Sequence, residues 1–340
     1  MDQRLPRKPT ISDVARWAGI STATVSRALA APEKVTARTR AIVLDAVRKI
    51  GYVPNLAARN LRTNKTKTIL AVLPDFSNVF FSRILRGISD RLVARGYSLI
   101  IADTRNDPAR EAQYAEFILA GRVDGVLLLN GRSIFTHRKG HAAVPTVSLC
   151  ERIANARFPH IETENREAAR MMTAYLVSLG HENIGYVRGP VTNVLEHERF
   201  AGYKDALLQS RLQYNPALVT SGDFTLESGE AAAEVYLSQP KLPDAIFACN
   251  DEMAMGLIRG LSAAGVTVPC DVSIAGFDDI EFAEAYIPPI TTVRQARRQI
   301  GERAAELLLQ SIDGDLSPER EIKLAAELVI RKSTARARTG

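Results

Sequence analysis

Residues 10–30 read TISDVARWAGISTATVSRALA, and their pattern predicts two short helices joined by a tight turn. Thr10 and Asp13 have the spacing of a helix-capping box, and apolar residues then recur at helical intervals. Gly19 supplies the left-handed residue that ends such a helix. Ser21 then caps a second helix. This stretch therefore predicts a helix-turn-helix, and the rest of the chain is interpreted around it.

The second helix presents an outer face of small and hydroxylated residues with a single arginine. Such a face fits a DNA major groove, because hydroxyls serve donor or acceptor edges, a methyl can touch thymine, and arginine pairs with guanine or a phosphate. An ordinary amphipathic hairpin with a solvated polar face is the alternative that this pattern leaves open. The residues expected to contact DNA in this region are Thr10, Ser21, Thr22, Ala23, Thr24, Ser26 and Arg27.

The residues from Asp13 to Leu29, DVAxxAGISxxTVSRxL, are more specific than the helical pattern. They resemble the helix-turn-helix of the LacI/GalR family of bacterial transcription regulators. The resemblance implies a small all-α headpiece followed by an α/β two-lobed core of the periplasmic-binding-protein type. It also implies a repressor, dimeric or tetrameric, that binds a palindromic operator on double-stranded DNA in the bacterial cytoplasm and associates with the nucleoid.

Charge is divided unevenly along the 340 residues. Residues 1–67 carry 14 lysines and arginines against 4 carboxylates, whereas the remaining residues carry 30 against 34. The basic part has the electrostatic footprint of a protein that binds a polyanion, and the acidic part gives no reason to bind one. The length allows more than one hydrophobic core. We therefore expect a small DNA-binding domain and a larger domain with a different task.

The cysteine pattern and the apolar runs argue against a secreted or membrane protein. Cys150, Cys249 and Cys270 are odd in number and lack metal-ligand spacing, which favours a reduced cytoplasmic setting without disulfides. The basic N-terminus has no apolar segment behind it, and no apolar run is long enough to span a bilayer. Nucleotide-binding and zinc-protease motifs are also missing from the sequence. A cleft enzyme for a carbohydrate or nucleoside, fused to the headpiece, is the alternative function.

Residues 53–67 follow the headpiece, to which we assign residues 1–52. They contain PNLAARNLR, which resembles the hinge helix of the family, and a helix this short is marginal unless DNA and a second copy pack against it. By the resemblance, Leu61 is a wedge inserted between base steps in the minor groove, and Asn55 and Ala58 also contact DNA. The alternative is a leucine that only completes the dimer contact.

From Thr68 onward, short apolar runs alternate with amphipathic segments, as in parallel sheets with crossover helices. Two similar sets predict two lobes of one core, residues 68–340. The resemblance to the family implies that three crossovers join the lobes. Lobe one is expected at about 68–162 and 292–321, and lobe two at about 163–291 and 322–335. The strands are expected at 69–74, 97–103, 125–130, 144–149, 183–189, 217–223, 244–250 and 271–277, with a returning segment at 291–295 and another at 322–331.

Ligands of open parallel sheets bind beyond the carboxyl ends of the strands, and these ends are unusually polar and aromatic here. An arginine among carboxylates and amides suits hydroxyls or a ring carbonyl, while an aromatic side chain covers a flat face. Glu151 and His197 are candidate partners for the edge of a base. The effector contacts that the family resemblance carries over are Phe80, Phe81, Arg199, Phe224, Asn250, Asp278 and Gln295.

The three phenylalanines favour a nucleoside over a free sugar, because they could sandwich a base. The FFS triplet that begins at Phe80, together with Glu151 and the GDFT segment at 222–225, is similar to the cytidine-responsive branch of the family. For Phe81 a plain core position is the alternative. We expect an uncharged, hydroxyl-rich effector with a flat face, and we predict no catalytic residue, metal or cofactor.

Overall fold

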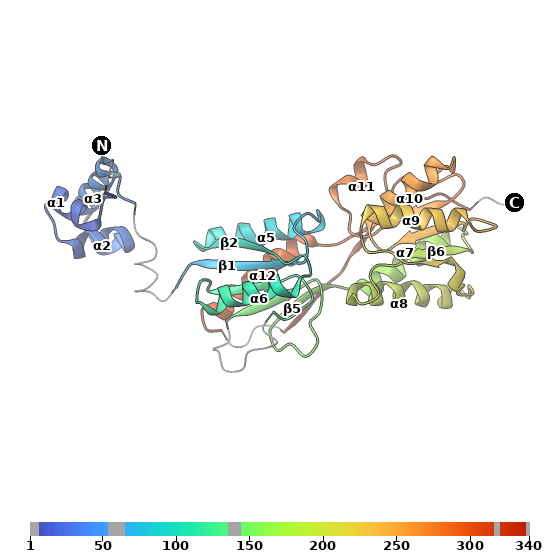
Figure 1. The fold of residues 1–340 in the computed structure, drawn as a ribbon, viewed down its shortest axis with the longest axis horizontal. Helices are drawn as coiled ribbons and strands as arrows, with labels where there is room; N and C mark the ends of the chain where they lie inside the picture. The colour runs from blue at the N-terminus through green and yellow to red at the C-terminus, as the bar shows by residue number, and fades with distance from the viewer. Residues whose placement is uncertain (1–6, 54–64, 135–143, 316–319, 338–340) are drawn as a thin grey trace. The chain divides into compact units, whose positions relative to one another are not determined.

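The chain forms two compact units, Met1–Thr66 and Lys67–Gly340, each described by itself. In the second unit, the described helices and strands form two lobes (Figure 1). The residues predicted for hinge contacts with DNA, Asn55, Ala58 and Leu61, lie outside the described residues, so their roles stay predictions. The computed structural model describes residues 7–53, 65–134, 144–315 and 320–337.

The N-terminal unit contains three α-helices around a small core. They are α1 (Ile11–Ala18), α2 (Thr22–Ala30) and α3 (Ala37–Ile50), with a 3-10 turn, η1, at Pro32–Lys34. All three helices contribute buried side chains. These are Val14, Ala15, Val25, Ala28, Val43 and Ala46.

Local chemistry fixes the ends of the first two helices. The backbone N and the Oγ1 of Thr10 donate to Oδ2 of Asp13 at 2.9 and 2.7 Å, and these bonds lower the pKa of Asp13. Gly19 ends α1 with a φ of 65°, which a residue without Cβ adopts freely. Ser21 Oγ accepts from Thr24 N at 3.1 Å and starts α2. The helix-turn-helix predicted from this stretch is confirmed.

The first lobe of the core is built on a six-stranded parallel sheet with the order β11-β5-β4-β3-β1-β2. Short apolar runs form its inner strands, as the sequence predicts for a sheet covered on both faces. The strands are β1 (Thr68–Leu73), β2 (Ser98–Asp103), β3 (Gly125–Leu128), β4 (Thr146–Leu149), β5 (His160–Thr163) and β11 (Glu321–Leu324).

Alternate residues of β1 face opposite sides of this sheet. Ile69 and Leu73 belong to the hydrophobic cluster formed with α5 (Phe80–Ala94) and α12 (Arg297–Ile312). Leu70 and Val72 belong to the cluster with Ile118 of α6, which spans Pro108–Leu119. Helices therefore lie on both faces of the sheet (Figure 1), and ligands of such sheets bind at the carboxyl ends of the strands.

The second lobe repeats this architecture with a four-stranded parallel sheet in the order β7-β6-β8-β9. Its strands are β6 (Ile184–Val187), β7 (Val219–Thr220), β8 (Ala245–Ala248) and β9 (Ser273–Ala275), and a 3-10 turn, η2, lies at Pro216–Leu218. Its helices are α7 (Asn165–Ser178), α8 (Val194–Gln209), α9 (Leu226–Leu237), α10 (Asp251–Ala263) and α11 (Glu281–Ala285).

Three helix pairs pack closely, α5 with α12, α7 with α8, and α9 with α10, and each has a glycine where the helices cross. A Cβ on Gly301 would lie 2.1 Å from the carbonyl oxygen of Ile84. A Cβ on Gly202 would lie 2.0 Å from the carbonyl oxygen of Arg166. A Cβ on Gly256 would meet the carbonyl oxygen of Leu226 in the same way. The glycines therefore permit backbone-to-backbone contact.

The chain passes between the lobes three times. It runs from β5 into α7, returns between β10 (Thr292–Arg294) and α12, and leaves again after β11 toward β12 (Glu327–Val329). β10 pairs antiparallel with β12, and Asp278 bridges to Arg294, which attaches this ribbon to the second lobe. Because β11 pairs with β5 through Leu324, lobe one ends three residues later than the predicted boundary at residue 321.

Buried Arg297 joins the two lobes beside the crossover. Its Nη1 donates to the carbonyl of Phe80 in the first lobe at 3.2 Å, and its Nη2 donates to the carbonyl of Asp279 in the second lobe at 2.7 Å. Glu281 of α11 lies 3.7 Å from the same guanidinium and also pairs with Arg83 of α5. None of the described helices has the length and apolar character needed to cross a membrane.

Candidate effector pocket and DNA-binding face

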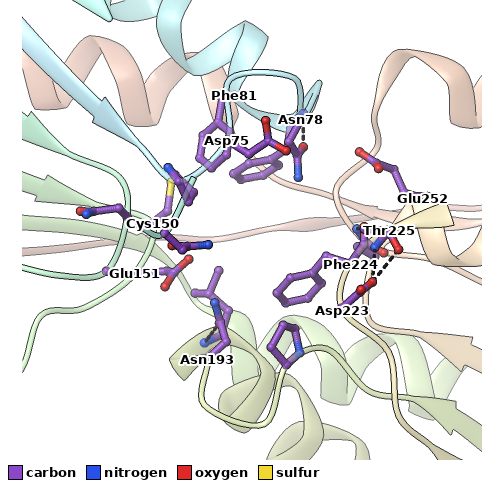
Figure 2. Close-up of a pocket in the computed structure, with 18 of the residues that line it drawn as sticks. Asp75, Asn78, Phe81, Cys150, Glu151, Asn193, Asp223, Phe224, Thr225 and Glu252 are labelled. Atoms are coloured by element: carbon purple, nitrogen blue, oxygen red, sulfur yellow. Dashed lines mark hydrogen bonds between the residues drawn. The ribbon is translucent and has the colours of Figure 1, made fainter. Parts of the chain in front are cut away.

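A cavity of about 660 Å³ lies between the two lobes of the core. It is lined at the carboxyl ends of strands from both sheets, as expected for a ligand site in open parallel sheets. Asp75 follows β1 and Glu151 follows β4, while Phe224, Asn250 and Asp278 come from the second lobe. Figure 2 shows side chains of the two lobes facing each other across this space.

Most of the predicted effector contacts line this cavity. His197 and Gln295 lie outside its lining, so the structure does not bring all the predicted residues together. The predicted residues that line it are Phe80, Phe81, Glu151, Arg199, Phe224, Asn250 and Asp278.

Arg199 forms the floor of the cavity, and protein groups already engage its donors. Its Nε donates to Oδ1 of Asn165 at 2.9 Å and its Nη1 to the carbonyl of Cys249 at 2.7 Å. Its Nη2 lies 3.4 Å from Oδ1 of Asp278, and the guanidinium stacks on Phe277 at 3.8 Å from the ring centroid. The arginine is thus fixed in place, and its charge is balanced within the floor.

Gln295 lies outside the cavity lining and binds Asp278, which belongs to the floor. Its Nε2 donates to Oδ1 of Asp278 at 2.6 Å, and its Oε1 accepts from Thr163 Oγ1 at 2.5 Å. Burial raises the pKa of Asp278, whereas Arg199, Arg297 and the Gln295 amide act in the opposite direction. The amide thus orients a carboxylate that faces the cavity, although the sequence predicted that it would contact the effector directly.

His197 lies away from the pocket floor. Its side chain is 59% exposed, and its Nε2 donates to the carbonyl of Val191 at 2.6 Å. His197 is on α8, which begins at Val194 because the Asn193 side chain accepts from Leu195 N at 2.8 Å. In this geometry the imidazole stabilises the loop before the helix. His197 is not part of the cavity lining, so the structure does not place it for the direct contact with a base that the sequence suggested.

Aromatic rings stand on both walls of the cavity. Phe80 and Phe81 begin α5 and meet edge to face at a centroid distance of 5.2 Å. Phe224 lies on the opposite lobe (Figure 2) with a φ of 73°, and the Asn250 Nδ2 donates to its carbonyl at 2.9 Å. Gly189 makes room for this ring, since a Cβ there would lie 2.4 Å from it. Flat apolar surfaces on both sides suit a planar ring.

Several polar residues of the lining are not among the predicted effector contacts. Asp75 and Asn78 follow β1, Asn193 caps α8, and Glu252 occupies the first turn of α10. Their positions at strand ends and helix caps were the only sequence signal for a role in the site. Aspartate, asparagine and glutamate are common at such positions for purely local reasons, so the signal is weak. Among the described residues, no group of three or more histidines, cysteines or carboxylates could hold a metal ion.

The DNA-binding prediction falls on α2 and its cap. Thr22, Ala23 and Arg27 are exposed on this helix, as is Ser21 before it. On the other side of α2, Val25 and Ala28 are buried in the headpiece core. The side chains of Thr10, Thr24 and Ser26 are only partly exposed. The helix therefore presents a short polar face with one exposed basic side chain. Faces of this kind read base edges in a DNA major groove.

Comparison with known proteins assigns both parts of the chain to one family. Residues 10–55 match the model of the bacterial regulatory proteins of the lacI family, and residues 173–334 match the periplasmic binding protein-like domain. The HTH-type transcriptional repressor CytR of Escherichia coli strain K12 is 37% identical over 327 residues, which cover 96% of each chain. The HTH-type transcriptional repressor PurR of Pasteurella multocida is 33% identical and covers 95% of this chain and 98% of its own.

Solved structures agree with this assignment. The lac repressor dimer bound to operator and the anti-inducer ONPF aligns with a TM-score of 0.86 at 28% identity, over 97% of this chain and 100% of that one. A complex of the transcriptional regulator CelR with cellobiose aligns with a TM-score of 0.70 at 30% identity, over 96% and 100% of the two chains. The chain therefore belongs to the LacI family of bacterial regulatory proteins and is a DNA-binding transcriptional repressor.

Proposed function

We propose that this repressor binds a palindromic operator as a homodimer and that an uncharged nucleoside in the pocket controls its affinity for DNA. The observation that carries the proposal is the composition of the pocket. Arg199, Asn250 and Asp278 form a polar floor suited to neighbouring hydroxyls, and phenylalanines from both lobes flank it. A pyranose needs less aromatic surface than a base, so the walls favour a nucleoside over a free sugar.

The headpiece supplies the operator contacts in this proposal. Arg27 and the small side chains before it read base edges, while the basic residues of the first 67 positions neutralise phosphates. A dimer places two recognition helices on the two halves of a palindrome. We propose the bacterial cytoplasm as the compartment, because that is where such DNA lies. Tetramer formation is a further possibility of the same proposal, and its test is the molecular mass in solution.

The pocket can couple to DNA because its walls come from two lobes. Closure of the lobes on a nucleoside moves one wall relative to the other, and only the difference in binding free energy between open and closed states shifts the equilibrium. Arg297 touches the backbone of both walls, since it binds the carbonyls of Phe80 and Asp279. A ligand that rearranges either wall therefore acts on a contact shared by the lobes.

Calorimetric titration of the full chain with cytidine, uridine, adenosine, ribose and a sugar acid tests the effector class. Saturable binding of a nucleoside, accompanied by a changed affinity for operator DNA, is the expected result. Binding of the sugar acid with none of the nucleosides would contradict the nucleoside assignment. We propose no catalytic role for the pocket, and recovery of the bound nucleoside unchanged after prolonged incubation is the matching check.

A further inference from the structure

Negative charge dominates the walls of the effector pocket. Arg132 and Arg199 are the arginines of its lining, and both already face carboxylates: Arg132 Nη1 lies 3.9 Å from Glu111, and Arg199 Nη2 lies 3.4 Å from Asp278. An anionic ligand would have to compete for them. The carboxylates of the lining outnumber the arginines, and they are Asp75, Glu151, Asp223, Glu227, Glu252 and Asp278.

Among the carboxylates of the lining, Glu252 is partly buried and the described protein groups do not engage it, whereas Glu227 also lacks a partner but is exposed. It lies partly buried in the first turn of α10, two residues after the capping residue Asn250. Within the described parts of the chain, its carboxylate makes no hydrogen bond and no ion pair. By contrast, Asp75 accepts two hydrogen bonds from Ser77. A partly buried carboxylate that faces a cavity without a protein partner is free to interact with whatever occupies the cavity.

Three other carboxylates act electrostatically on Glu252. Asp278 approaches from the end of β9, Asp75 from the first lobe after β1, and Glu227 from α9. Burial, reinforced by these three charges, raises the pKa of Glu252 to about 7. Figure 2 shows Asp75 and Glu252 on opposite sides of the space between the lobes. Closure of the lobes on a ligand would therefore concentrate negative charge at this edge of the pocket.

We infer that Glu252, with Asp75 opposite it, is a specificity residue that admits an uncharged ligand and rejects the phosphorylated form of the same ligand. The inference rests on the proposed function, since it concerns the same pocket and names the charge class that it accepts. A phosphate monoester would bring up to two negative charges into a partly desolvated wall of like charge. A hydroxyl in the same place can instead donate a hydrogen bond to a carboxylate.

Paired titrations of the full-length protein at pH 7.5 test this inference. The pairs are cytidine and its 5′-monophosphate, uridine and its 5′-monophosphate, and ribose and ribose 5-phosphate. We expect the neutral member to bind at least tenfold more tightly than its phosphate ester. Glu252→Gln should reduce that ratio at least threefold, mainly by improving binding of the ester, whereas affinity for the neutral member changes less. Glu234→Gln on the exposed side of α9 removes an equal charge outside the pocket and should leave the ratio unchanged.

The dependence on pH separates a charge effect from a steric one. Because Glu252 titrates near pH 7, discrimination by the wild-type protein should grow from pH 6 to pH 8. The phosphate ester also ionises in this range, so the trend in Glu252→Gln gives the contribution of the ligand alone. The wild-type protein should show the steeper trend. Equal slopes for the two proteins would overturn the role of Glu252.

The remaining outcomes distinguish this inference from the proposed function. If a nucleoside and its monophosphate bind equally well, the charge selection is wrong while the nucleoside assignment stands. If only the ribose pair binds and its phosphate is rejected, the nucleoside assignment is wrong while the charge selection stands. If no neutral member binds, both are overturned.

Discussion

Arg199 gives the pocket a floor whose charge is balanced before any ligand arrives. Replacing it with methionine keeps much of the volume but leaves Asp278 buried without its cation. Removing one partner of a buried ion pair costs about 3–5 kcal/mol. We therefore expect Arg199→Met to lower the free energy of unfolding of the ligand-free protein by that amount, measured by urea denaturation.

The control for this variant is Arg166→Met. Arg166 pairs with Asp205 on the surface, where its side chain is 59% exposed, and an exposed pair contributes at most about 1 kcal/mol. The loss of unfolding free energy in Arg199→Met should also be smaller at pH 5 than at pH 8. Burial already raises the pKa of Asp278, and losing Arg199 raises it further, so protonation at low pH relieves the cost. Equal losses for both variants would show that Arg199 does not organise the floor.

Arg27 makes a separate prediction at the recognition helix. If it reads a base edge, Arg27→Ala should cost about 1–3 kcal/mol on the true operator and reduce discrimination among related sites. Arg38 at the start of α3 is the matched control, because it is exposed and expected to meet phosphates. Arg38→Ala should weaken binding evenly across sequences. Titration of both variants against operator and scrambled DNA would contradict the assignment if their profiles were alike.

For single residues, the sequence was enough to predict the motif residues but not their geometry. The family resemblance carried over Arg199, Asn250 and Asp278 as effector contacts, and all three line the pocket. The sequence could not identify Glu252, since a carboxylate in the first turn of a helix is ordinary local chemistry. Gly189 was missed as well, because its role depends on a ring 35 positions away in the sequence, that of Phe224.

Among the elements, paired helices with a glycine at the crossing hold each lobe together. Gly202→Ala would place a Cβ 2.0 Å from the carbonyl oxygen of Arg166, which is backbone of the neighbouring helix. The helices α7 and α8 would have to move apart. Overpacking of this kind costs about 1–3 kcal/mol. We expect a lower midpoint of urea unfolding for this variant.

Lys204→Ala provides the comparison for Gly202→Ala. Lys204 lies on the same helix with an exposed side chain over the Phe200 ring, so its replacement should change stability by at most about 1 kcal/mol. Unfolding midpoints that coincide for the two variants would mean that the crossing tolerates a methyl group. In that case the close approach of α7 and α8 would not depend on the glycine.

Strands and helices with strong periodicity were predictable, and exceptions have local causes. The strand at His160–Thr163 was missed because Ile161 is its only apolar residue, and its pairing with β4 and β11 is a property of the sheet. The helix α8 begins at Val194, because the Asn193 side chain caps it there. The helix at Glu281–Ala285 is too short for a periodic signal.

For the whole molecule, the two compact units and the charge asymmetry predict that function separates along the chain. We expect residues 67–340 alone to fold, associate and bind the effector of the intact protein, but not to bind operator DNA. Residues 1–66 alone should bind DNA only weakly, since a single headpiece lacks the second half-site contact of a dimer. Thermal unfolding with and without nucleoside, followed by DNA titration, checks both fragments.

The dependence of binding on salt concentration is the control for this separation of DNA binding from effector binding. Affinity of the intact protein for DNA should fall steeply as salt rises, because the basic N-terminal part releases counterions from the phosphates. Effector binding by residues 67–340 should change far less, since an uncharged ligand releases none. A core fragment that cannot fold, or that binds no effector of the intact protein, would count against separate functions.

The free carboxylate of Glu252 also bears on how such a regulator can acquire a new signal. Because no described protein group depends on that side chain, a single codon change at position 252 can alter the charge that the pocket accepts without disturbing the fold. Arg199 offers no such freedom, since its replacement would unbalance the floor. After gene duplication, descendants of this protein could therefore diverge in the metabolite that they sense while they inherit the same scaffold and the same operator.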